Sequence, residues 1–188
     1  RILRMHDSDD KRCAYTLMLP DEAATLALGG ALAAALAAAE PAPAGLVIYL
    51  EGDLGAGKTT LVRGLLRALG HEGKVKSPTY TFVEPYAISK LNLYHFDFYR
   101  FEHAEEYLDG GFGEYFGNGA IGLVEWPDKA APFLPPADLR VCLGIVDDGR
   151  MAGLVAGSAE GERCLRCLTN LAATPLRAAT SSNSPPPR

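Results

Sequence analysis

Residues 52–60 read GDLGAGKTT. Their spacing matches G-x-x-x-x-G-K-[ST], the pattern of a phosphate-binding loop. Glycines let the chain bend where a Cβ would clash, so that consecutive backbone N–H groups can converge on an anion. We expect Lys58 to reach the outer phosphates of a nucleotide and the Thr59 hydroxyl to hold Mg²⁺.

The sequence on each side of this loop meets the structural requirements of the motif. Residues 46–50, LVIYL, form a short apolar run that is typical of a buried parallel strand. After the loop, Leu61, Leu65 and Leu69 recur near helical spacing, and Gly70 is a suitable helix end. A glycine-rich turn without a ligand is the alternative, and the strand–loop–helix context favours nucleotide binding.

Composition and charge limit the possible partners. The chain has 188 residues, of which 48% are hydrophobic, and this suits one globular domain with a sizeable core. Its formal net charge is −5, and no run of Lys or Arg exceeds two residues. Because nucleic-acid affinity comes from clustered positive charge, we expect RNA to be reached only through a partner.

An alanine-rich stretch from Asp21 to Ala39 could be mistaken for a targeting segment. Lys11 and Arg12 precede it, but Asp21 and Glu22 interrupt it, and alanine drives membrane insertion weakly. An amphipathic, alanine-rich helix is the better interpretation. No segment is long and apolar enough to span a bilayer, so we expect a cytoplasmic protein.

The remaining segments predict an α/β fold. We also expect strands at 15–19, 91–100 and 120–126, and a hairpin formed by 139–146 and 151–158. Residues 74–86 are expected to be a loop that leads into a further strand. Together with helices between them, they indicate a P-loop NTPase-like layered fold. Its central sheet would be mostly parallel with an antiparallel edge hairpin, and helices would cover both faces.

The domain boundaries follow from composition. We expect a polar lead-in at 1–14 and a P-loop domain at 15–171, with a final helix that ends near Leu171. The Ser/Pro-rich residues 172–188 are predicted to be a disordered tail.

Cys164 and Cys167 form a lone C-x-x-C pair. A redox or metal role is possible for such a pair. However, both cysteines share one helical face with Leu168 and Leu171, and no second Cys or His pair stands nearby. We therefore interpret them as packing residues.

Candidate catalytic side chains lie on two predicted strands. Glu125 ends the apolar run 121–124, and Asp97 lies within the strand 91–100; ligands of open α/β sheets bind at the carboxyl ends of strands. Phosphate-loop enzymes place a metal-holding acid there. Thr79 lies in a loop from which a hydroxyl could sense the γ-phosphate. A helix cap or a solvated edge is the alternative for the acids, and ordinary turn chemistry the alternative for Thr79.

Two neighbouring residues are ambiguous from sequence. Trp126 could line the nucleotide pocket or belong to the core. His95 lies in a closely patterned aromatic strand, which favours a structural role over proton transfer.

Four stretches, GDLGAGKTT, VKSPTYTFVEPY, LYHFDFYR and LVEWPDK, occur in this order between residues 20 and 150. Together they resemble the TsaE (YjeE) family of small bacterial ATPases. The resemblance implies ATP and Mg²⁺ as ligands and a role in making threonylcarbamoyladenosine in tRNA. It also implies docking on a heterodimer of TsaB and TsaD, with tRNA contacted only indirectly. We expect the chain to be a monomer when alone.

The resemblance also implies roles for individual positions. The implied nucleotide contacts are Glu22, Leu54, Gly55, Ala56, Gly57, Lys58, Thr59, Thr60 and Gly149. Thr59 and Glu125 fall on the Mg²⁺ ligands of the family, and Asp97 falls on the acid implicated in hydrolysis.

A catalytic hypothesis follows. Lys58 and the loop amides would stabilise charge on the transferred phosphoryl group, while Asp97 or Glu125 would orient or deprotonate water. Arg100 is the candidate for an arginine finger within the chain. Without a clear finger, we expect slow intrinsic hydrolysis that a partner accelerates.

Three other functions are alternatives. A small-molecule kinase would close an arginine-rich lid, but Arg100 is the only arginine between 97 and 137. A GTPase would carry an N-K-x-D segment, and the sequence has none. A nucleotide-dependent binding module without catalysis stays open.

Overall fold

The computed structural model describes residues 14–38, 45–88, 91–117 and 119–178. The strands are β1 (Ala14–Leu19), β2 (Leu46–Glu51), β3 (Val83–Ile88), β4 (Leu91–Asp97), β5 (Ile121–Glu125), β6 (Leu139–Val146) and β7 (Gly149–Ala156). The helices are α1 (Glu22–Ala38), α2 (Lys58–Ala68), α3 (Glu106–Asp109) and α4 (Ala159–Ala178), with 3₁₀ segments η1 (Phe112–Tyr115) and η2 (Pro127–Ala130). Residues 1–13 of the predicted lead-in lie outside the described residues.

The described strands form a seven-stranded sheet in the order β1-β7-β6-β2-β5-β4-β3. Its centre, β6-β2-β5-β4, is parallel. The predicted hairpin is β6–β7, which confirms an antiparallel edge, but β1 pairs outside β7 and becomes the outermost strand. At the opposite edge β3 pairs antiparallel with β4, so both edges of the sheet are antiparallel. The predicted α/β class is confirmed.

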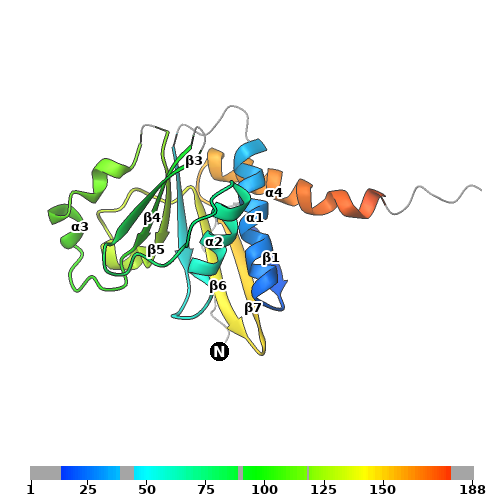
Figure 1. Ribbon diagram of the computed structural model, residues 1–188, viewed down its shortest axis with the longest axis horizontal. Coiled ribbons are helices and arrows are strands. Elements are labelled where there is room, and N and C mark those ends of the chain that lie inside the picture. Colours follow the sequence, from blue (N-terminus) through cyan, green and yellow to red (C-terminus); the bar gives the residue numbers. More distant parts are fainter. Residues whose placement is uncertain (1–13, 39–44, 89–90, 118, 179–188) are drawn as a thin grey trace, which may run out of the picture.

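Helices cover both faces of this sheet, because residues of each central strand point alternately to one face and the other. On one face, Leu46, Ile48 and Leu50 of β2 belong to a core that α1, α2 and α4 complete. On the other, Tyr49 belongs to an aromatic core under α3, η1 and η2. Figure 1 shows α1, α2 and α4 grouped together and α3 well apart from them.

The alanine-rich helix is confirmed as α1, but its predicted amphipathic character is wrong. Its exposed positions include Ala23, Ala27 and Ala34, so both its faces are apolar. The helix is held by close packing on α2 instead. A Cβ on Gly29 would lie 2.2 Å from Leu61 O, so only glycine allows this approach of the two backbones.

The C-terminal helix is longer than predicted. It continues to Ala178, past the expected end near Leu171 and into the predicted tail. Residues 172–178, AATPLRA, contain mostly good helix formers, and the Ser/Pro-rich composition begins only after them. Residues 179–188 lie outside the described residues.

The cysteine pair packs within this helix, as predicted. Cys164 is buried in the core with Leu168, and Cys167 packs against the same cluster. Burial raises the pKa of Cys164 to about 11, so its thiol stays protonated at neutral pH. Over the described part of the chain, no three His, Cys, Asp or Glu side chains are grouped to hold a metal ion.

A helix must be about 20 residues long and predominantly apolar to span a bilayer. No helix within the described ranges is both long and apolar enough to cross a membrane.

Candidate functional site

The loop between β2 and α2 has the backbone conformation that its glycines allow. Gly52, Gly55 and Gly57 have φ values of 137°, 81° and 107°, which L-residues with a side chain rarely adopt. A Cβ on Gly52 would also lie 2.2 Å from Leu143 O of β6. Gly57 precedes α2, and no side chain of the described residues caps that helix N-terminus. Its free amides can therefore bind an anion.

Lys58 is held by the loop that it follows. Its side chain is buried, and Nζ donates to Gly52 O at 2.6 Å and to Asp53 O at 3.0 Å. Nζ also lies 4.2 Å from the ring centroid of Trp126. Burial lowers the pKa of Lys58, and Glu125 is the largest of the nearby charges that oppose this shift. The ammonium group is therefore positioned at the cavity before any phosphate is present.

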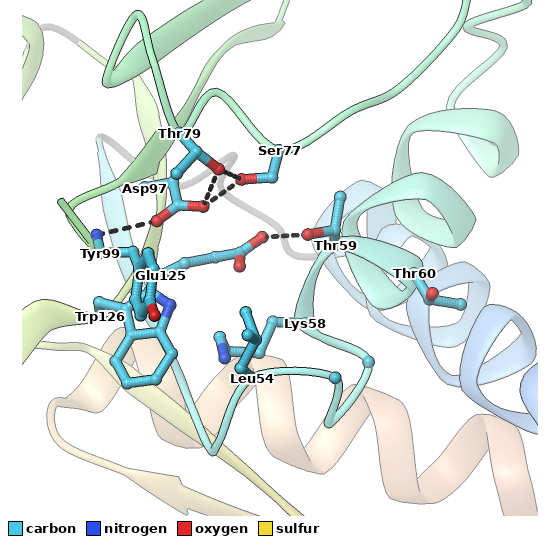
Figure 2. Close-up of a pocket in the computed structure, with 12 residues that line it drawn as sticks. Leu54, Lys58, Thr59, Thr60, Ser77, Thr79, Asp97, Tyr99, Glu125 and Trp126 are labelled. Carbon is cyan, nitrogen blue, oxygen red and sulfur yellow. Dashed lines mark hydrogen bonds between the residues drawn. The ribbon is translucent and has the colours of Figure 1, made fainter.

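The two predicted acids come together at the carboxyl ends of neighbouring strands. β4 and β5 are parallel, and Asp97 pairs in register with Glu125. Glu125 Oε1 accepts a hydrogen bond from Thr59 Oγ1 at 2.8 Å (Figure 2). A carboxylate at the end of one strand is thus joined to the hydroxyl that follows the loop lysine.

Asp97 accepts hydrogen bonds on both carboxylate oxygens. Thr79 Oγ1 donates to Oδ2 at 3.0 Å, and Ser77 Oγ donates to the same oxygen. The backbone N–H of Tyr99 donates to Oδ1 at 2.9 Å. Figure 2 shows Ser77 and Thr79 on the Asp97 side of the site, across from Lys58. The acid therefore fixes the segment 77–79 beside the phosphate loop.

His95 is buried in the sheet, which favours the predicted structural role, and it also contacts the site. It is fully buried, and Nε2 lies 2.9 Å from Glu125 Oε1. Since an ionised carboxylate only accepts hydrogen bonds, Nε2 carries the proton of this pair. Nδ1 is buried without a hydrogen-bond partner among the described residues. An unpaired buried nitrogen is unfavourable, so a histidine at this core position needs a compensating role. We infer that this role is the hydrogen bond to Glu125.

These groups surround a cavity of about 300 Å³. Its lining residues are Leu54, Gly55, Gly57, Lys58, Thr59, Thr60, Ser77, Thr79, Asp97, Tyr99, Glu125 and Trp126. The structure places Trp126 in this lining, with its ring centroid 5.0 Å from that of Tyr99. Its φ of 58° is unusual for a bulky residue, and such strain is concentrated at functional sites.

Several residues that the sequence analysis assigned to the site lie outside this lining. Ala56 is buried in the core. Glu22 is exposed at the start of α1, with Oε1 3.6 Å from Arg63 Nη1. Gly149 packs beside Leu19, whose carbonyl oxygen would lie 2.9 Å from an added Cβ. Arg100 donates to the Tyr80 hydroxyl at 3.2 Å, away from the cavity.

Sequence reasoning missed three residues at the site. Ser77 carried a signal, because it stands two positions before Thr79 in the same loop. Tyr99 also could have been found, since it follows the strand that ends at Asp97. Arg150 contacts the phosphate loop from β7, and only its position after Gly149 pointed to it.

The donor set suits a hard cation shared with phosphate. Thr59 and Glu125 offer oxygen atoms that already lie within hydrogen-bond distance of each other. Mg²⁺ keeps several waters and needs only one or two protein ligands when phosphates supply the rest. The site therefore fits Mg²⁺ with a nucleotide better than a metal held by protein side chains alone.

The chain is similar to known proteins over most of its length. A family model described as "Threonylcarbamoyl adenosine biosynthesis protein TsaE" matches residues 19–151. A Haemophilus influenzae protein named "tRNA threonylcarbamoyladenosine biosynthesis protein TsaE" is 43% identical over 157 residues, covering 84% of this chain and 99% of that protein. A protein of the same name from Synechocystis is 46% identical over 123 residues, covering 62% of this chain and 72% of its own length.

A solved structure extends the similarity to the fold. The crystal structure of Bacillus subtilis YdiB matches with a TM-score of 0.68 and 29% sequence identity. The match covers 87% of this chain and 99% of that one. The sequence and the fold thus give the same relationship.

Proposed function

This chain belongs to the TsaE family of tRNA threonylcarbamoyladenosine biosynthesis proteins, and on that premise we propose that it binds Mg-ATP and hydrolyses it in support of that tRNA modification. One observation carries the proposal. A phosphate-loop lysine, a Thr59–Glu125 pair and Asp97 converge on one cavity. These are the parts that phosphoryl transfer to water requires.

The loop supplies phosphate binding. The amides at the start of α2 are uncapped, and the glycine conformations let the loop enclose an anion. Lys58 would replace its hydrogen bonds to two carbonyl oxygens with hydrogen bonds to the outer phosphates, with little movement of its buried side chain. Trp126 lies against Lys58 and would shield that ammonium group from water.

Thr59 and Glu125 would hold Mg²⁺. When bound, the ion would neutralise charge on the phosphate oxygens. His95 donates to the oxygen of Glu125 that also accepts from Thr59, and so keeps this carboxylate oriented. The imidazole acts here through Glu125 and does not transfer a proton.

Asp97 is the better of the two acids for orienting water. Glu125 would be occupied by the metal ion that it holds with Thr59, whereas Asp97 Oδ1 accepts one hydrogen bond, from Tyr99 N, and retains a lone pair. An attacking water could donate to that lone pair. Ser77 and Thr79 occupy Oδ2 and hold the carboxylate in place.

The cavity lining contains a single cation, Lys58, among the described residues. Arg100, the candidate finger, contacts Tyr80 instead. This supports slow hydrolysis by the chain alone and completion of the site by a protein partner. The family's pathway implies such partners, and we propose a TsaB–TsaD-like heterodimer, with tRNA contacted indirectly because the chain has a net charge of −5.

Calorimetric titration of the chain with ATP, with and without Mg²⁺, tests the binding step. ATP hydrolysis and tRNA modification are then measured with and without the heterodimer. We expect Mg-dependent binding, slow hydrolysis alone and faster hydrolysis with the partners. Absence of binding, or equal rates with and without partners, would contradict the proposal. An Asp97→Asn variant that hydrolyses no ATP yet supports modification would favour the non-catalytic binding module.

A further inference from the structure

Two cations hold the carbonyl groups of the phosphate loop from different sides. Lys58 Nζ donates to the carbonyls of Gly52 and Asp53. Arg150 Nε donates to Ala56 O at 3.2 Å, and its Nη2 donates to Gly55 O at 3.3 Å. The arginine thus holds the half of the loop that the lysine does not contact.

Arg150 is itself anchored in the sheet. It is the second residue of β7, where it pairs with Leu19 of β1 and with Ile145 of β6. Its Nη1 donates to Gly149 O at 3.1 Å, which further fixes the guanidinium. Since the Arg150 backbone is paired with strands on both sides, its side chain extends from a rigid part of the sheet.

The geometry of the peptide bond links these contacts to anion binding. In a trans peptide, the C=O of one residue points opposite to the N–H of the next. The contact with Ala56 O therefore directs the Gly57 N–H away from Arg150, and Gly57 lines the cavity. The Ala56 N–H donates to Asp53 O at 3.1 Å, which closes the turn on the other side.

We propose that Arg150 is a positioning residue that holds the Gly55 and Ala56 carbonyls and thereby preorganises the loop amides for phosphate. The proposal rests on the proposed nucleotide binding. Lys58 must leave its carbonyls to reach a phosphate, whereas Arg150 can keep both contacts throughout. It acts through the loop backbone, and its role is distinct from that of an arginine finger on the γ-phosphate.

The test compares Arg150→Met and Arg150→Lys with Arg166→Met. Arg166 is an exposed arginine of α4, so its loss is a control for net charge. Trp126, the single tryptophan of the chain, lines the cavity and reports binding of ADP and of ATP by its fluorescence. Hydrogen exchange of residues 55–57 in the free protein reports loop order independently of any ligand.

We expect Arg150→Met to bind ADP and ATP about tenfold more weakly, because the nucleotide would then have to order the loop on binding. Amide exchange at 55–57 should be faster, while turnover at saturating ATP should stay near that of the wild type. Arg150→Lys should recover little, because one ammonium nitrogen would replace the separate Nε and Nη2 donors that reach Ala56 O and Gly55 O. Arg166→Met should match the wild type.

Unchanged affinity and exchange in Arg150→Met would overturn the proposal. A fall in turnover with unchanged affinity would show a catalytic arginine instead, and full recovery in Arg150→Lys would show a role for charge alone. If the wild type binds no nucleotide, the proposed function fails, while the exchange measurement still decides the role of Arg150 in the loop. Arg150→Gln replaces Arg150→Met if the latter does not fold.

Discussion

Replacement of Lys58 by methionine should separate nucleotide binding from stability. Methionine keeps an unbranched apolar side chain in the buried position and removes the ammonium group. In the free protein that group donates to Gly52 O and Asp53 O at 2.6 and 3.0 Å. Loss of these two hydrogen bonds costs about 1 kcal/mol each. Removal of a buried charge offsets much of this cost, because burial already disfavours the charged form.

We therefore expect the free energy of unfolding of Lys58→Met to stay within about 1 kcal/mol of the wild type at neutral pH. The lowered pKa of Lys58 adds a pH dependence. Between the folded pKa and the unfolded value of 10.5, the unfolded chain binds more protons, so wild-type stability rises with pH in that alkaline window. The variant should lack this part of the rise. Denaturant unfolding at neutral and alkaline pH measures both effects.

ATP binding should respond far more strongly. A unit charge about 4 Å from a phosphate charge contributes up to about 4 kcal/mol at an effective dielectric constant of about 20. Lys58 gives up its carbonyl contacts when it binds phosphate, which reduces this gain. We expect the variant to lose about 2–4 kcal/mol of ATP-binding free energy, which corresponds to a roughly 30- to 1,000-fold weaker Kd. Calorimetry is the suitable assay, because Lys58 lies against Trp126 and its loss would change the fluorescence. The control is Lys74→Met, which removes an exposed lysine. A Kd within threefold of the wild type would refute the reasoning.

The remaining predictions concern three other side chains. Glu125→Gln should bind metal-free ATP at least as tightly as the wild type but lose most of the gain from Mg²⁺, which a magnesium titration at fixed ATP measures. His95→Leu should weaken that magnesium dependence about tenfold, whereas His95→Gln, which retains a donor for Glu125, should preserve it; equal effects of the two variants would contradict the positioning role. Cys164, with a pKa of about 11, should be alkylated very slowly at pH 8 and about tenfold faster per pH unit up to that pKa, as peptide mass spectrometry of the native protein can test.

Local chemistry made part of this site predictable. The conformation of the loop 52–60 could be predicted from its sequence, because the spacing of its glycines, Lys58 and Thr59 is the pattern of a phosphate-binding loop. Glu125 was predictable as a polar residue that ends an apolar strand, and Asp97 as an acid on a neighbouring strand, although the predicted strand continued past Asp97 to residue 100. That the two acids lie close together could be predicted from the rule that the carboxyl ends of parallel strands meet at one edge of a sheet.

Contacts between distant segments were not predictable. The hydrogen bond that Ser77 donates to Asp97 depends on how a loop folds back over a strand end. Arg150 reaches Gly55 across 95 positions of sequence, through the pairing of β7 with β6 and β1. The missing amphipathic pattern of α1 has a related cause. Its packing uses backbone approach at Gly29, which leaves no hydrophobic periodicity to detect.

The charges of the cavity explain why a metal ion should accompany the nucleotide. Among the lining residues Lys58 contributes one positive charge, and Asp97 and Glu125 contribute two negative ones. Asp53 and Asp128 lie close enough to influence Lys58 as well. A triphosphate that enters without a cation therefore meets a site with net negative charge, and repulsion opposes the attraction of the loop amides. A divalent cation held by Glu125 would reverse this balance, so the acid that would weaken binding of free ATP would favour binding of ATP together with Mg²⁺.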